Sequence, residues 1–134
     1  MGEVINSDEY KYASTSRVKN PIFHQHPSHI YFCESNHEVV DAIELAKTYK
    51  KQIRVRSGGH HHAGLSSGND VVVIDTSKFK KIRLLPGKDG QTLLMRVGPG
   101  VQVKDVEKFN ETRKIMFPLG GCGDVCMGGF VTGG

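Results

Sequence analysis

The chain has 134 residues, a length that suits one domain with a moderate hydrophobic core. A net charge of +4, no apolar run of membrane-spanning length and an odd count of three cysteines argue against a nucleic-acid-binding protein, a membrane protein and a disulfide scaffold. Glycine is the outlier, with 16 residues gathered in a few stretches, against a usual share of roughly 7%.

Residues 1–24 predict an N-terminal lead-in rather than part of the main fold. The first twenty residues are polar, and we expect a loose segment that Tyr10 and Tyr12 dock onto the rest. The acidic start lacks the apolar core of a signal peptide, so the cytoplasm is the default expectation.

A strand, a helix and a second strand follow, in the order typical of a βαβ unit. Residues 29–33 are short, apolar and β-prone. Ser35 and Glu38 have the spacing of a capping box, and apolar residues then recur with helical periodicity up to a lysine-rich end near residue 51. Residues 52–55 form the second predicted strand, which should run parallel to the first because a helix connects them.

The second predicted strand leads directly into a loop of glycines and histidines, Arg56 to Gly64. Adjacent glycines tolerate positive φ, so successive N–H groups there can face one concavity, which is typical of phosphate binding. Arg56 could add a charge, Ser57 a hydroxyl donor, and His60 a ring nitrogen next to the bound group. The same loop, taken alone, also fits a tight surface turn that carries histidines.

The remaining segments predict a small sheet and a helix before a glycine-rich tail. Residues 71–75 are a strand buried on both faces, and residues 82–85 and 92–97 are a hairpin joined by turn residues. Residues 101–114 predict a helix, whose inward side chains are Val103, Val106 and Phe109. The tail, residues 120–134, is expected to be a second run of bare backbone.

Other kinds of site have weaker support. Neither a complete G-x-G-x-x-G nor a P-loop motif is present, so a Rossmann fold and a P-loop are not predicted. A zinc site using Cys122 and Cys126 would lack the usual ligand spacings, so we predict no metal. A Cys–His catalytic pair stays open as an alternative. The simpler interpretation is that each cysteine is a small, buried hydrophobic residue, and this applies above all to Cys33.

Two motifs in order resemble berberine-bridge-enzyme-like flavin oxidases of the vanillyl-alcohol-oxidase and p-cresol-methylhydroxylase (PCMH) superfamily. Arg56 to His60, with Gly64, is similar to that family's R-S-G-G-H-x-x-x-G loop. The tail is similar to its G-x-C-x-x-V-G-x-G-G segment, and Asp75, residues 97–100 and residues 118–120 also fall in step. The resemblance covers residues 25–134 and implies an α+β, PCMH-type FAD-binding domain, with a βαβ unit and a small, mainly antiparallel sheet.

The resemblance implies FAD, joined covalently to a ring nitrogen of His60 at its 8α-methyl group and to the sulfur of Cys122 at ring carbon C6. Cys126 stands where the family usually has glycine and offers a competing thiol, while Phe130 and Gly123 replace a frequent histidine and proline. The implied cofactor-binding residues are Arg56, Ser57, Gly58, Gly59, His60, His61, Gly64, Gly121, Cys122, Val125, Gly128, Gly129 and Gly133.

The implied activity is oxidation of a small molecule by hydride transfer from an alcohol or amine-type carbon to FAD, with O2 as the acceptor. Family members continue for several hundred residues, so we expect a fragment whose FAD-binding domain is truncated at its C-terminal end and which contains no catalytic residue. The remainder of the protein, or a second chain, would complete the FAD site. The alternatives are an FAD-binding module or subunit that is inactive without a partner chain, and a non-enzymatic remnant.

Overall fold

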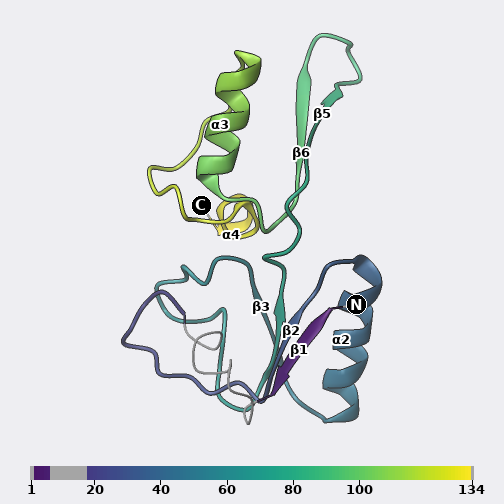
Figure 1. Ribbon diagram of the computed structural model, residues 1–134, viewed down its shortest axis with the longest axis vertical. Coiled ribbons are helices and arrows are strands. Elements are labelled where there is room, and N and C mark those ends of the chain that lie inside the picture. The colour runs from purple at the N-terminus through teal and green to yellow at the C-terminus, as the bar shows by residue number, and fades with distance from the viewer. Residues whose placement is uncertain (1, 7–17, 134) are drawn as a thin grey trace.

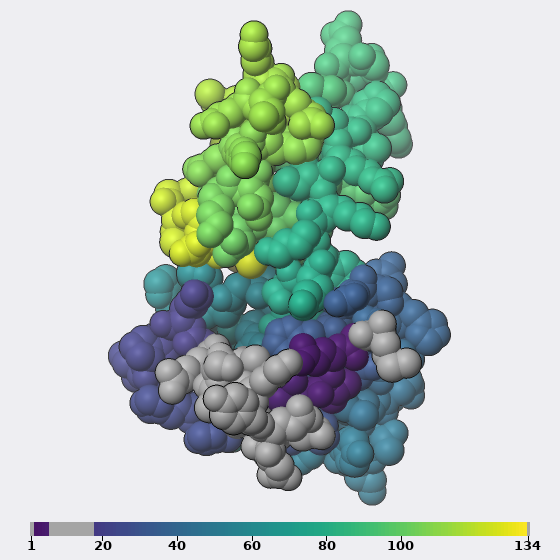
Figure 2. Space-filling model, in the orientation of Figure 1, coloured from purple at the N-terminus to yellow at the C-terminus, as the bar shows by residue number. Residues whose placement is uncertain are grey.

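The computed structural model describes residues 2–6 and 18–133, which form two lobes stacked along the long axis of the molecule (Figure 1). The lower lobe contains a four-stranded sheet and helix α2 (Asn36–Thr48), and the upper lobe contains a β-hairpin with helices α3 (Val103–Arg113) and α4 (Met127–Gly133). The molecule narrows where the lobes meet (Figure 2). The predicted α+β class, with a βαβ unit and a small antiparallel sheet, is confirmed.

Strand β4 (Val72–Asp75) lies between the two strands of the βαβ unit, β2 (His29–Phe32) and β3 (Ile53–Arg56). Both neighbours run parallel to β4, so β2 and β3 are parallel to each other as predicted, although they are not adjacent. All four β4 residues are buried, as predicted. A strand that is apolar on both faces takes a central position because both faces must be covered.

The other edge of this sheet is strand β1 (Glu3–Asn6), which pairs with β2 in antiparallel register. The expectation of a loose lead-in is wrong for these residues, because Ile5 is 1% exposed and packs in the core against β2 and β4. Tyr10 and Tyr12, expected to dock the lead-in, lie outside the described residues.

Helix α2 covers one side of the sheet, and the irregular segments 18–28 and 57–71 lie on its other side (Figure 1). The predicted N-terminal cap forms, since the Ser35 hydroxyl accepts the Glu38 N–H at 3.3 Å. The Glu38 carboxylate accepts the N–H of Glu34 at 2.7 Å, and this hydrogen bond lowers the pKa of that carboxyl. The helix ends at Thr48, three residues before the predicted lysine-rich end.

The upper lobe is built on the predicted hairpin, β5 (Ile82–Pro86) and β6 (Leu93–Val97), against which α3 packs. Val103 and Val106 of α3 are buried as predicted, whereas Phe109 is half-buried beneath the guanidinium of Arg113, at 4.0 Å. The tail forms helix α4 from residue 127 onward, where bare irregular backbone was expected. In the described ranges, no helix is long and apolar enough to cross a membrane.

Gly64, at the end of the glycine loop, packs against the segment that precedes β2. It has φ +67°, and a Cβ there would lie 2.7 Å from Cγ of Phe23. Gly90, in the hairpin turn, has the same φ but no atom within 4 Å of such a Cβ. The two glycines therefore separate the cost of positive φ from the cost of a steric clash.

We expect Gly64→Ala to destabilise the fold more than Gly90→Ala. Both variants place a side chain in the left-handed region, at a cost of about 1–2 kcal/mol. Only Gly64→Ala also overpacks against Phe23, which adds about 1–3 kcal/mol. Urea denaturation of the three proteins measures the difference, and equal unfolding midpoints for the two variants would contradict the contact with Phe23.

Candidate functional site

A buried ion pair joins the C-terminal ends of β3 and β4. Arg56 Nε donates to Asp75 Oδ2 at 2.6 Å, and the two side chains are only 6% and 4% exposed. The second carboxylate oxygen, Oδ1, accepts the Ser77 N–H at 2.9 Å. The sequence analysis assigned the positive charge of Arg56 to a bound anion, but within the protein this charge is matched by Asp75.

Hydroxyl groups connect the first residues after each of these strands. The Thr76 hydroxyl donates to the Arg56 carbonyl at 3.1 Å, so the Ser57 hydroxyl donates to Thr76 Oγ1 at 2.9 Å. Thr76 and Ser77 were not identified from the sequence. Their position in the sequence could have identified them, because they are polar residues at the carboxyl end of a parallel strand, where ligands of open α/β sheets bind.

The loop after β3 presents unpaired backbone donors. Among the described residues, no acceptor takes the N–H of Ser57, Gly58, Gly59 or His60. Gly59 has φ +71°, a conformation that glycine adopts readily. Successive N–H groups without a partner in the described part of the chain are available to an anion, which is what the two adjacent glycines predict.

The C-terminal glycine stretch lies against this loop, although some seventy residues of sequence separate them. A Cβ on Gly58 would lie 3.1 Å from Cys126 Sγ and 3.3 Å from its backbone nitrogen. A Cβ on Gly128 would lie 2.5 Å from Ser57 Oγ and 2.8 Å from Cβ of Pro99. A side chain at Gly128 would therefore force its neighbours to shift, and one at Gly58 would be tightly packed.

The turn between β6 and α3 holds the two stretches together. Its Pro99 carbonyl accepts the Gly128 N–H at 2.9 Å, and its Gly100 carbonyl accepts the Cys126 thiol at 3.6 Å. A Cβ on Gly100 would collide with the carbonyl oxygens of Thr76 and Ser77. This turn therefore contacts both the carboxyl ends of the sheet and the start of α4.

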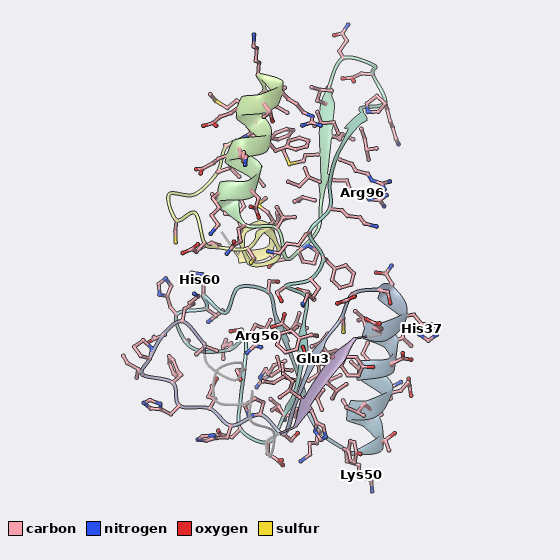
Figure 3. All side chains as sticks on the ribbon, viewed as in Figure 1. Glu3, His37, Lys50, Arg56, His60 and Arg96 are labelled. Atoms are coloured by element: carbon pink, nitrogen blue, oxygen red, sulfur yellow. The ribbon has the colours of Figure 1, made fainter. Side chains whose placement is uncertain are left out.

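The three consecutive histidines have different surroundings. His60 is half-buried on the side of the lower lobe that faces the upper lobe (Figure 3), and its Nε2 is buried without a hydrogen-bond partner among the described residues. His61 and His62 are exposed. The Nδ1 atom of His61 accepts the N–H of Ala63 at 3.1 Å. Among the three rings, only that of His60 has a nitrogen that is buried without a partner in the described part of the chain.

Of the other predicted site residues, some pack within the protein and some face open space. Gly64 packs against Phe23, and Val125 packs in the hydrophobic cluster of the upper lobe while its carbonyl accepts the Val103 N–H. In the described part of the chain, nothing lies within 4 Å of a Cβ built on three glycines of the tail: Gly121, Gly129 and Gly133. Backbone that faces open space without side chains leaves room for a flat ligand to approach.

The cysteines differ in exposure and acidity. Cys33 and Cys126 are buried, and Cys122 is exposed. Burial raises the pKa of the Cys33 thiol to about 11, and burial also raises the pKa of Cys126. Next to Cys122, the pKa of Asp124 is lowered, first by its hydrogen bond from Lys104 at 2.8 Å. Over the residues described, no group of three or more His, Cys, Asp or Glu side chains could hold a metal ion.

Comparison with known proteins gives one consistent result. Residues 27–134 match the protein family described as FAD binding domain. Berberine bridge enzyme-like 12 of Arabidopsis thaliana is 32% identical over 110 residues, which are 81% of this chain and 21% of the plant protein.

Solved structures extend the similarity to the fold. The structure of aclacinomycin oxidoreductase superposes with a TM-score of 0.86 at 28% identity, over 100% of this chain and 27% of that one. That of 6-hydroxy-D-nicotine oxidase from Arthrobacter nicotinovorans gives 0.83 at 26% identity, over 94% and 27%. The chain spans between 18% and 29% of the length of curated relatives that it matches.

Removing one partner of the buried ion pair should be costly. Asp75→Ala leaves the guanidinium of Arg56 buried without its carboxylate, and we expect a loss of about 3–5 kcal/mol in the free energy of unfolding. The double variant Arg56→Met, Asp75→Asn removes both charges and keeps an oxygen for the Ser77 N–H, so it should recover most of that loss. Urea denaturation measures both, and a double variant no more stable than Asp75→Ala would show that the charge pair is not the cause.

Thiol reactivity should follow burial. In the folded chain at neutral pH we expect iodoacetamide to modify Cys122 quickly and Cys33 and Cys126 slowly, because the thiolate is the reactive form and both buried thiols have raised pKa values. Peptide mass spectrometry locates the label. Cys122→Ser should abolish the fast phase, and all three thiols should react in urea; fast labelling of Cys126 in the folded chain would contradict its burial.

Proposed function

Since the chain belongs to the FAD-binding domain family, we propose that the loop after β3 and the C-terminal glycine stretch together hold FAD. The observation that carries this proposal is the row of N–H groups of residues 57–60, which have no acceptor in the part of the chain that the structure describes, with the Gly128 region packed against it. These donors suit the two phosphate groups of a dinucleotide. The open backbone at Gly121 and Gly129 suits the approach of a flat ring system.

The chain's own residues divide this task. The N–H groups of Ser57, Gly58 and Gly59 bind the diphosphate, and the Ser57 hydroxyl is fixed in place by Thr76. Arg56 acts through Asp75, by holding the end of β3 against the end of β4, because its Nε is committed to that carboxylate. FAD, when bound, supplies a ring that accepts a hydride from a substrate carbon.

We further propose that His60 is the covalent attachment residue. Its Nε2 is buried and has no partner among residues 2–6 and 18–133, whereas His61 and His62 are exposed. A ring nitrogen of His60 would supply the covalent bond to the 8α-methyl carbon of the flavin. Cys122 is the second attachment residue rather than Cys126, because the Cys122 thiol is accessible and the Cys126 thiol is buried with a raised pKa.

For the whole protein, the proposed activity is that of an FAD-linked oxidase acting on an alcohol or amine-type carbon of a small molecule, with O2 as acceptor. Support comes from proteins of similar structure, which include 6-hydroxy-D-nicotine oxidase and aclacinomycin oxidoreductase. Because the chain spans 27% of each of these two proteins, the second candidate is an FAD-binding module that needs further polypeptide for activity.

Intact-mass spectrometry after incubation with FAD and acid precipitation tests the attachment residue. We expect the wild-type chain and His62→Ala to carry the added mass of one FAD, because the ring of His62 is exposed. His60→Ala should lose the covalent mass and retain FAD that acid releases. A covalent flavin on His60→Ala would refute the His60 assignment, and no flavin on any of the proteins, covalent or released, would refute FAD binding by this chain.

A further inference from the structure

The loop after β3 offers an anion its backbone donors without a free cationic side chain of its own. Arg56 is committed to Asp75, and the N–H groups of residues 57–60 are the donors that remain. The diphosphate of FAD is anionic, and a charge acts over a longer range than a dipole. A cation supplied by another segment would therefore add attraction that the loop does not provide.

Lys19 lies against this loop, in the segment that precedes β2. Its N–H donates to the Gly59 carbonyl at 2.9 Å, and a Cβ on Gly59 would lie 3.7 Å from the Cα of Val18. The Lys19 side chain is exposed and forms no ion pair with a described residue. The pKa of Asp124 is lowered first by its hydrogen bond from Lys104 and further by the charge of Lys19. Lys19 is therefore near both the loop and the C-terminal glycine stretch.

Lys80 approaches the same place from the segment that follows β4. The carbonyl of Phe79 accepts the Gly100 N–H at 3.1 Å, and the Gly100 carbonyl accepts the Cys126 thiol at 3.6 Å. Cys126 Sγ in turn lies 3.1 Å from a Cβ built on Gly58. Burial raises the pKa of Cys126, and the charge of Lys80 opposes that increase. Lys80 is exposed and, within the described ranges, has no ion-pair partner.

Their position distinguishes these two lysines from exposed lysines elsewhere. Lys88 is also exposed and, in the described part of the chain, unpaired, but it belongs to the turn between β5 and β6. That turn lies at the end of the upper lobe remote from the lower lobe (Figure 1). Lys19 and Lys80 instead come from two separate segments to one row of N–H groups. Positive charges and free donors gathered around one point are typical of an anion site.

We propose that Lys19 and Lys80 bind the diphosphate of FAD together with the N–H groups of residues 57–60. This inference rests on the proposed function, and it adds two binding residues that lie outside both glycine motifs. A lysine suits the task because its ammonium group is a point charge with three donors on a flexible stem. The backbone donors orient the phosphate groups, and the two lysines add attraction that salt can screen.

Equilibrium titration of FAD, followed by quenching of its fluorescence, tests this inference. The background protein carries His60→Ala and Cys122→Ser, so that FAD binds reversibly. We expect Lys19→Gln and Lys80→Gln each to weaken FAD binding about fivefold, the upper range for one exposed ion pair. Arginine at either position should retain most of the affinity. Lys88→Gln removes the same charge from the hairpin turn and should leave the binding unchanged.

Ionic strength separates the effect of charge from an effect on structure. Raising the salt concentration should weaken FAD binding to the background protein, and should weaken it less when both Lys19 and Lys80 are replaced by glutamine. Equal affinity and equal salt dependence of these two proteins would overturn the role of the lysines while leaving FAD binding intact. A background protein that binds no FAD at any salt concentration would refute the proposed function, and this inference with it. Circular dichroism of each variant checks the fold.

Discussion

The buried pair of Arg56 and Asp75 is the interaction on which the arrangement of the site depends. Each residue is the last of its strand, so the pair fixes the two strand ends relative to one another. The same carboxylate holds the Ser77 N–H, and the carbonyls of Thr76 and Ser77 pack against Gly100 of the upper lobe. A buried charge without its partner is expensive, so the pair tolerates little movement.

This pairing decides how an anion can be held at the loop. The only cationic side chain within the loop motif is neutralised by Asp75, and attraction must come mainly from backbone N–H dipoles. Two polar atoms at the site, His60 Nε2 and Arg56 Nη1, are buried without a hydrogen-bond partner among the described residues. Such groups destabilise a chain by about 1–3 kcal/mol each unless a ligand or water pairs with them.

The sequence predicted what local patterns determine and missed what depends on long-range register. Periodicity and capping located α2, turn residues located the hairpin, and a continuous apolar run located β4. Strand β1 was missed because four residues give no pattern, and α4 because its glycines oppose helix formation until Met127 is buried. The motif located the loop, yet the partner of Arg56 follows only from the pairing of β3 with β4.

The glycines of the two motifs serve two separate purposes that a sequence motif cannot distinguish. A Cβ on Gly58 would be tightly packed, 3.0 Å from Cδ2 of His60 and 3.1 Å from Cys126 Sγ. Gly128, like Gly100 in the turn before α3, is needed by the chain itself, since a Cβ on either would strike another segment. They would be required even in a protein that bound nothing. A Cβ on Gly121 or Gly129 would meet nothing within 4 Å among the described residues, so packing gives no reason for these two glycines. The evidence for a ligand therefore lies in the glycines whose Cβ position faces open space. The closely packed glycines explain how two segments distant in sequence come near enough to bind one ligand.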